Sequence, residues 1–364
     1  MVICIKGVGW HLPDLPDSTE TAGTDRSIPA MVLRAVQACL ADAQVNMPDV
    51  DAVVTASVDL WDGKTASNIA ITEVVGAVMK PETRIAGDGL LALIHAAMAI
   101  LSGQYQRVLV TAHGKATEGD AEAISNWSFD PVYQQTLGLT DSHALGLQAQ
   151  AFLKRAPGDI GSDSARSRIV SALSQENGEL AGSEFLDSPV TFFPLHDSEI
   201  ATQGDGACAV LLEQGGAGPR LEAFGYDLDP HYLGDRDLAR CKTLQRAAQR
   251  GYTMATISDA RKEIQRCYWS LRTAIQLPLW AEAAGVWSLH RGLDTLLQRE
   301  VTTDGNAVHK THWDGLPPFA TGLQRLICAT RDLRQQRAEG RVLVQGCHGP
   351  AGQTQVVCIL STER

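Results

Sequence analysis

The stretch from Thr83 to His113 reads TRIAGDGLLALIHAAMAILSGQYQRVLVTAH and decides the fold. Asp88 stands between two glycines, and from Leu90 to Leu101 apolar residues recur at helical spacing and fill most of the other positions too. A helix that is apolar nearly all round is buried in the middle of a protein. Gly103 favours the end of this helix, and the run from Val108 to Val110 is typical of a strand covered on both faces. A corner between a strand and a buried helix often displays a reactive group.

The composition limits the class of protein. The chain has 364 residues, which is enough for two domains or for one fold built from two similar halves. Its hydrophobic content of 44% is normal for a globular protein, and its net charge of −11 argues against a nucleic-acid surface. No apolar run reaches membrane-spanning length, so we expect no membrane span.

The cysteines and the first residues indicate a cytoplasmic protein. The chain opens on an apolar strand pattern, from Val2 to Ile5, with no signal peptide before it. The eight cysteines are scattered, and none forms a Cys-x-x-Cys pair, so we expect no metal site. Most of these cysteines lie in apolar segments, as reduced core thiols do.

Strands and helices alternate in two successive halves, 1–214 and 215–364, which predicts an α/β fold with internal duplication. Residues 114–200 are rich in Ser, Gly, Asp and Gln and are expected to cover a site. Further helices are expected over residues 27–43, 65–79, 141–154, 163–177, 257–275, 292–301 and 320–335. Strands are expected over 2–9, 52–55, 107–113, 207–212, 220–226, 285–289, 341–345 and 353–361.

Five segments in this order resemble the thiolase superfamily, most strongly its sterol-carrier-protein type. They are the central unit, PLHDSEIATQGDGACAVLLE from Pro194, SLHRGLD from Ser288, GLPPFATGLQRLICATRDLR from Gly315, and VLVQGCHGPAGQTQVVCIL from Val342. The resemblance covers nearly the whole chain. It implies a thiolase-like five-layered αβαβα sandwich of two similar halves, usually dimeric.

The resemblance also places the family's catalytic positions, and two of them have changed. The nucleophilic cysteine of the turn before the central helix falls on Gly87, which cannot form a thioester. The histidine of the family's Gly-His-Pro segment falls on Leu316. The segment that helps to form an oxyanion hole aligns with His290, and the family's acid/base cysteine aligns with Cys347. Some cysteine-less relatives perform a retro-aldol cleavage with a tyrosine where this chain has Phe319.

Each candidate residue has a structural and a functional interpretation. Asp88 is suited to cap the central helix, or to act as a general base whose pKa is raised by burial. His290 is a core histidine or an oxyanion donor. Cys347 is an inert buried thiol or a catalytic group, and the adjacent His348 is a possible helper of that thiol.

Two functions from different classes follow. The first is an enzyme that acts on an acyl-CoA or a related acyl thioester without an acyl-cysteine, by acyl transfer, Claisen-type condensation or retro-aldol cleavage. Coenzyme A would enter only as the thioester substrate, and no cofactor would be bound covalently. The second is a catalytically inactive subunit that supports a cysteine-bearing thiolase-like partner. A thiolase-like homodimer or heterodimer, or a small zinc-ribbon/OB-fold subunit, would be the partner.

Overall fold

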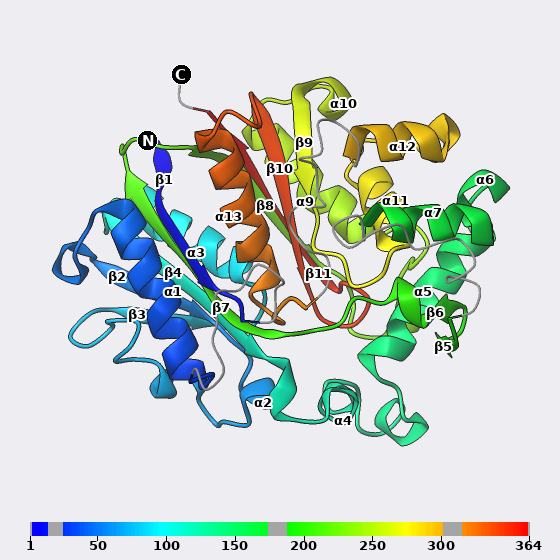
Figure 1. Cartoon of the computed structure of the whole chain (residues 1–364), viewed down its shortest axis with the longest axis horizontal. Coiled ribbons are helices and arrows are strands. Elements are labelled where there is room, and N and C mark those ends of the chain that lie inside the picture. The colour runs from blue at the N-terminus through cyan, green and yellow to red at the C-terminus, as the bar shows by residue number, and fades with distance from the viewer. Residues whose placement is uncertain (1, 14–24, 174–187, 301–314, 363–364) are drawn as a thin grey trace.

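The computed structural model describes residues 2–13, 25–173, 188–300 and 315–362. Their main feature is a mixed sheet of nine strands, shown in Figure 1. The strands lie in the order β3 (Glu82–Ile85), β2 (Ala52–Ala56), β4 (Arg107–Lys115), β7 (Asp205–Gln214), β1 (Ile3–His11), β8 (Arg220–Leu228), β11 (Thr354–Ser361), β10 (Arg341–His348) and β9 (Ile264–Tyr268).

Parallel pairs lie at the two ends of this sheet. Strands β3, β2 and β4 are parallel to one another, as are β10 and β9, and the pairs between them are antiparallel. The register of β1 and β8 includes a single pair, Cys4 opposite Arg220, so the two halves of the sheet meet at a short seam. A second, two-stranded sheet joins β5 (Val190–Phe192) to β6 (Leu195–His196).

Helices cover both faces of the sheet. The central pair is α3 (Gly89–Leu101) and α13 (Thr321–Arg334), which contact each other and strands of both halves. Helix α1 (Ile28–Ala43) packs on β1 and β7, and α9 (Lys242–Met254) packs on β8 and β11 (Figure 1). The other α-helices of the described residues are α2 (Asp59–Asp62), α4 (Ala121–Asn126), α5 (Asp141–Arg155), α6 (Gly158–Gly161), α7 (Asp163–Leu173), α10 (Ala260–Glu263), α11 (Gln276–Ala283) and α12 (Gly292–Glu300).

Side chains that alternate in direction along a strand belong to different hydrophobic cores on the two faces of the sheet. In β7, Cys208, Val210 and Leu212 face the cluster that contains α3 and α13, while Ala207, Ala209 and Leu211 face the cluster beneath α1. Successive side chains of a strand point to opposite faces, so one strand contributes to two cores. In the other half, β11 divides its residues in the same way between the central cluster and the cluster under α9 and α11.

The sequence predicted the central unit correctly, because β3, α3 and β4 lie where the Thr83–His113 stretch put them. Three predicted elements were wrong. Residues 65–79 form turns and the short 3₁₀ helix Ser67–Ala70, and residues 285–289 form no strand. The helix predicted over 257–275 is replaced by α10 and the edge strand β9, which pairs with β10. The ends of two predicted helices, residues 174–177 and 301, lie outside the described residues.

The predicted absence of a membrane span agrees with the structure. Among the residues that the structure describes, no helix is both long enough and apolar enough to cross a bilayer.

The contact between α1 and β1 depends on Gly9. A Cβ atom at this position would lie 2.4 Å from the carbonyl oxygen of Ala35 and from the amide nitrogen of Cys39, both backbone atoms of α1. We therefore expect Gly9→Ala to lower the free energy of unfolding by about 1–3 kcal/mol in a urea titration. Gly158→Ala is the control, because its Cβ would meet no atom within 4 Å. Equal midpoints for the two variants would contradict this account.

Candidate functional site

Asp88 joins the N-termini of the two central helices. It is the N-cap of α3, as the sequence predicted, and its Oδ1 accepts a hydrogen bond of 2.9 Å from the amide of Leu90. Its Oδ2 accepts a second bond, of 3.1 Å, from the amide of Gly322 in the first turn of α13. Helix N-termini attract negative charge, so two helix dipoles converge on one carboxyl group that is only 2% exposed.

Two glycines make room for this carboxyl group. A Cβ atom on Gly322 would lie 2.0 Å from Asp88 Oδ1, and one on Gly346 would lie 2.4 Å from the same oxygen. Real Cβ atoms do not approach that closely. Glycine at these two positions of α13 and β10 is therefore a requirement of the buried aspartate, not of backbone conformation.

Burial raises the pKa of Asp88 from its ordinary value of 3.8 to about 7. Removal of the carboxylate from water is the largest cause, and the hydrogen bonds from Leu90 and Gly322 act in the opposite direction because they favour the charged form. A carboxyl group of this kind is partly protonated at neutral pH. It therefore has the pKa that suits proton transfer near pH 7.

A cavity of about 230 Å³ lies next to this corner. Asp88, Cys347 and His348 line it, together with aromatic side chains that include Trp61 and Phe319. The aromatic rings and the imidazole form a row of edge-on contacts, with centroids 5.9 Å apart for Trp61 and Phe319 and 5.4 Å apart for Phe319 and His348. The structure thus brings three of the four predicted site residues to one pocket.

Gly87 lies beside the imidazole of His348. A Cβ atom at Gly87 would meet no atom closer than 3.6 Å and would lie 3.8 Å from Cδ2 of the imidazole. A side chain would therefore fit where the resemblance places a cysteine, but this chain has none. Leu316, aligned with a family histidine, is buried in the central core and is not part of the cavity wall.

The other two pocket residues are held in their uncharged forms. Burial raises the pKa of the Cys347 thiol to about 12, and the nearby Asp88 carboxyl adds to this effect. Burial also lowers the pKa of His348, which favours the neutral imidazole. Cys347 is nevertheless the least buried of the eight cysteines, all of which are free thiols. A thiol with this pKa can give a proton but is a poor nucleophile at neutral pH.

His290 does not join the site. It lies in a 3₁₀ turn, is exposed, and does not line the cavity. Besides the end of β10, the residues that follow β9 reach the cavity, among them Ser270 and Arg272. Ser270 and Arg272 were not predicted as site residues, because the sequence of β9 was assigned to a helix. Asp141, at the start of α5, was not predicted either, because its only signal was a polar residue after a helix cap.

Within the described ranges, no cluster of His, Cys, Asp or Glu has the geometry of a metal site.

Buried amides hold the walls of the cavity together. Gln148 donates a bond of 3.0 Å to the carbonyl of Ala351, in the loop after β10. Its oxygen accepts a bond of 2.9 Å from Gln276, whose own oxygen accepts one of 2.7 Å from the amide of Arg272. Two segments far apart in the sequence are therefore fixed against each other by side chains that are 1–2% exposed.

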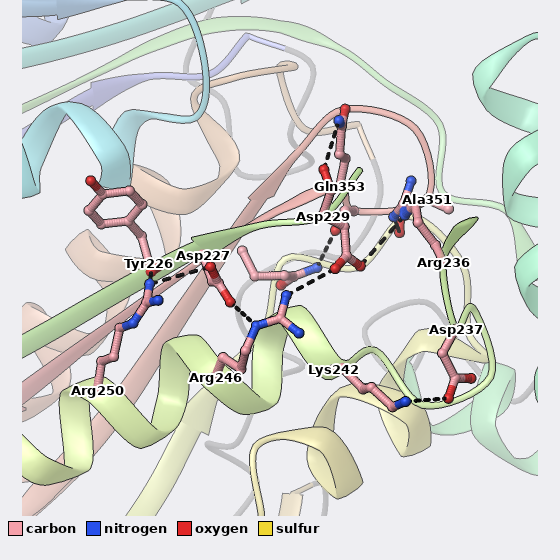
Figure 2. A network of polar contacts seen from close by, with 12 residues as sticks. Tyr226, Asp227, Asp229, Arg236, Asp237, Lys242, Arg246, Arg250, Ala351 and Gln353 are labelled. Atoms are coloured by element: carbon pink, nitrogen blue, oxygen red, sulfur yellow. Dashed lines mark hydrogen bonds and ion pairs between the residues drawn. The ribbon is translucent and has the colours of Figure 1, made fainter. Parts of the chain in front are cut away.

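Arg236 also holds this loop, and Figure 2 shows its contact with Ala351. Its guanidinium donates to the carbonyls of Pro350, at 2.7 Å, and Ala351, at 3.1 Å. Its Nε lies 3.6 Å from a carboxylate oxygen of Asp229, and that residue's backbone exchanges two hydrogen bonds with Gln353. Arg236 is therefore a positioning residue for the loop that follows Cys347 and His348.

Comparisons with known proteins support the fold and extend no further. No family model matches the chain, and no curated protein matches it. Among solved structures, it is similar to one described as "Ltp2-ChsH2(DUF35) aldolase", with a TM-score of 0.76, 18% identity, and coverage of 100% of this chain and 98% of that one. It is also similar to a monomeric SCP2-thiolase like protein type 1 from Mycobacterium smegmatis, with a TM-score of 0.70, 16% identity, and coverage of 100% and 77%. The fold is thus thiolase-like.

The raised pKa of Asp88 makes stability depend on pH. Between pH 4 and pH 7 the folded chain keeps a proton that the unfolded chain has released, so the free energy of unfolding falls as pH rises and is level above that window. Three pKa units correspond to about 4 kcal/mol. We expect Asp88→Asn to remove a large part of this slope in urea titrations at several pH values. Asp120→Asn, an exposed N-cap on α4, should keep it, and an unchanged slope in the Asp88 variant would contradict the raised pKa.

Loss of the Arg236 contacts should loosen the loop after Cys347. Hydrogen bonds from charged groups contribute about 1.5–3 kcal/mol, so we expect Arg236→Gln to speed alkylation of Cys347 by about tenfold or more. Mass spectrometry of peptides after iodoacetamide treatment measures this rate. Arg246→Gln is the matched control, because Arg246 reaches Asp227 and Asp229 but not the loop. The same rate in both variants would exclude the positioning role.

Proposed function

We propose that this chain acts on an acyl-CoA or a related acyl thioester by proton transfer, without an acyl-cysteine intermediate. One observation carries the proposal. The corner at Gly87 and Asp88 has no sulfur, would admit a Cβ atom at residue 87 beside His348, and adjoins a cavity lined by groups that can exchange protons. Claisen-type condensation and retro-aldol cleavage share one requirement, which is a proton acceptor next to a polarised thioester.

The roles follow from the protonation states. The neutral imidazole of His348 lines the cavity beside Gly87 and is the proposed proton acceptor. In the retro-aldol direction it takes the proton of a β-hydroxyl group, the bond between the α and β carbons breaks, and a carbonyl and an enolate result. The protonated thiol of Cys347 or the carboxyl of Asp88 then gives a proton to the enolate carbon, so that atoms and charge balance. In acyl transfer to a small molecule, His348 takes the proton of the attacking group, the bond between the acyl carbon and sulfur breaks, and Cys347 or Asp88 gives a proton to the leaving thiolate.

A catalytically inactive subunit is the second candidate. Both oxygens of Asp88 accept backbone hydrogen bonds, which gives this residue a complete structural role. Phe319 lines the cavity without a hydroxyl group that could take part in acid–base chemistry. In this proposal the chain supports a cysteine-bearing thiolase-like partner, or pairs with a small zinc-ribbon/OB-fold subunit. The aldolase to which the chain is similar is described together with a DUF35 protein, and this supports such a pairing.

We also propose that the chain consists of two duplicated halves, 1–214 and 215–364, stacked as a five-layered sandwich. From the outer edge inward, parallel strands are followed by antiparallel ones in both halves of the sheet. Helices α3 and α13 lie between strands of both halves, and both direct their N-termini at Asp88.

Deuterium exchange tests the proposed chemistry and separates the two candidates. Butanoyl-CoA incubated with the protein in heavy water should gain deuterium at the carbon next to the thioester, as read by NMR. His348→Ala should lower the exchange rate at least a hundredfold, in keeping with general base catalysis. His290→Ala is the control, because this histidine is exposed and lies outside the cavity.

No exchange above the background of buffer, together with a thiolase-like chain that co-purifies with the tagged protein, would favour the inactive subunit. An acyl adduct on Cys347, seen as a mass increase of the intact chain, would contradict both proposals.

A further inference from the structure

One ion pair in the cavity wall leaves some of its buried hydrogen-bonding atoms without a partner. Arg272 Nη1 donates a hydrogen bond of 3.0 Å to Asp141 Oδ2, and both side chains line the cavity. Arg272 Nε and Asp141 Oδ1 are buried and find no hydrogen-bond partner among the described residues. One donor and one acceptor of the same pair are therefore left unused.

Another pair of similar exposure shows that the fold can satisfy such groups. Arg155 donates to both oxygens of Glu282, and its Nε donates to the carbonyl of Ala239 at 3.2 Å. The side chains of Arg155 and Glu282 are 22% and 26% exposed, compared with 31% and 22% for Arg272 and Asp141. Unlike Arg155 and Glu282, Arg272 and Asp141 both line the cavity, and they leave one buried donor and one buried acceptor unsatisfied. Buried polar atoms without partners are costly, so such a pair favours a ligand that completes it.

We propose that Arg272 and Asp141 form a binding subsite for an uncharged ligand group that both accepts and donates a hydrogen bond, such as a hydroxyl or an amide. Its oxygen accepts from Arg272 Nε, and its O–H or N–H donates to Asp141 Oδ1, after a small rotation of the side chains toward the ligand. This inference rests on the proposed function, because it takes the cavity to be the thioester site.

A carboxylate is the ligand group that an arginine usually suggests, and the charge of Asp141 excludes it. A carboxylate offers only acceptors, so it would leave Asp141 Oδ1 unsatisfied and would be repelled by that carboxylate. Asp141 already neutralises Arg272, and the ion pair therefore brings no net positive charge to the cavity. The subsite thus selects polar but uncharged groups and rejects an acyl chain that ends in a carboxylate.

The group could come from two parts of a thioester: a hydroxyl on the acyl chain, or an amide of the pantetheine arm. Calorimetric titration with coenzyme A, butanoyl-CoA, 3-hydroxybutanoyl-CoA and succinyl-CoA distinguishes them. If the acyl hydroxyl is bound, the wild type prefers 3-hydroxybutanoyl-CoA to butanoyl-CoA about threefold to tenfold, the contribution of one hydrogen bond. Arg272→Lys, which keeps the charge and loses Nε, then abolishes this preference.

If an amide is bound instead, Arg272→Lys weakens the binding of coenzyme A and of all the thioesters by the same factor. Arg155→Lys is the matched control and should bind like the wild type. If the wild type binds these compounds and Arg272→Lys binds all of them equally well, the subsite is disproved while the proposed function stands.

If the wild type binds none of them, the proposed function fails, and a second measurement still decides the subsite. The 15N–1H signal of Arg272 Nε, assigned by its loss in Arg272→Lys, is followed during titration with S-(3-hydroxybutanoyl)-N-acetylcysteamine, which carries both a hydroxyl and an amide. A saturable shift supports the subsite, and no shift overturns it.

Discussion

The structure depends on one buried carboxyl group between two helix ends. Asp88 accepts one bond from α3 and one from α13, and it occupies a space that exists only because residues 322 and 346 are glycines. The amide of Gly89 adds a 2.7 Å bond to the carbonyl of Phe319, so the two helix starts are tied twice. Because α3 comes from the first half of the chain and α13 from the second, this junction sets how the halves meet. The cavity lies beside this junction, so the same contacts fix both the packing of the two helices and the position of the site.

The walls of the cavity follow from that junction. Strand β10 ends with Gly346, Cys347 and His348, and the loop that follows it is held by Arg236 and by Gln148. The carbonyl of Ala351 accepts bonds from both of these side chains. A loop that is held by two side chains helps to keep the preceding thiol and imidazole in place without burying them fully, and this combination of order and access is what a ligand site requires.

The central helix and its cap could be predicted because their signals are local. Apolar spacing, a terminal glycine and an N-cap aspartate all lie within one short stretch. Strand β9 could not, because the spacing of Ile264, Cys267 and Tyr268 fits a helix as well as a strand, and pairing with β10 decides the outcome. That error hid Ser270 and Arg272, and it left His290 as the apparent histidine of the site. Contacts between distant segments, such as Gln148 with Ala351, leave no mark in the sequence near either residue.

Burial raises the pKa of an acid and lowers the pKa of a base, and in this cavity both changes favour the uncharged form. It raises the pKa of Asp88 and of the Cys347 thiol and lowers that of His348, so the cavity disfavours charge on each of them. The dipoles of two helices favour an anion at Asp88, yet desolvation is the larger effect. A thiolate at residue 87 would face the same desolvation and would need a compensating cation, while the arginine of the cavity wall is already paired with Asp141. The glycine at residue 87 and the neutral groups around it therefore belong to one consistent environment, which suits the movement of protons better than a charged nucleophile.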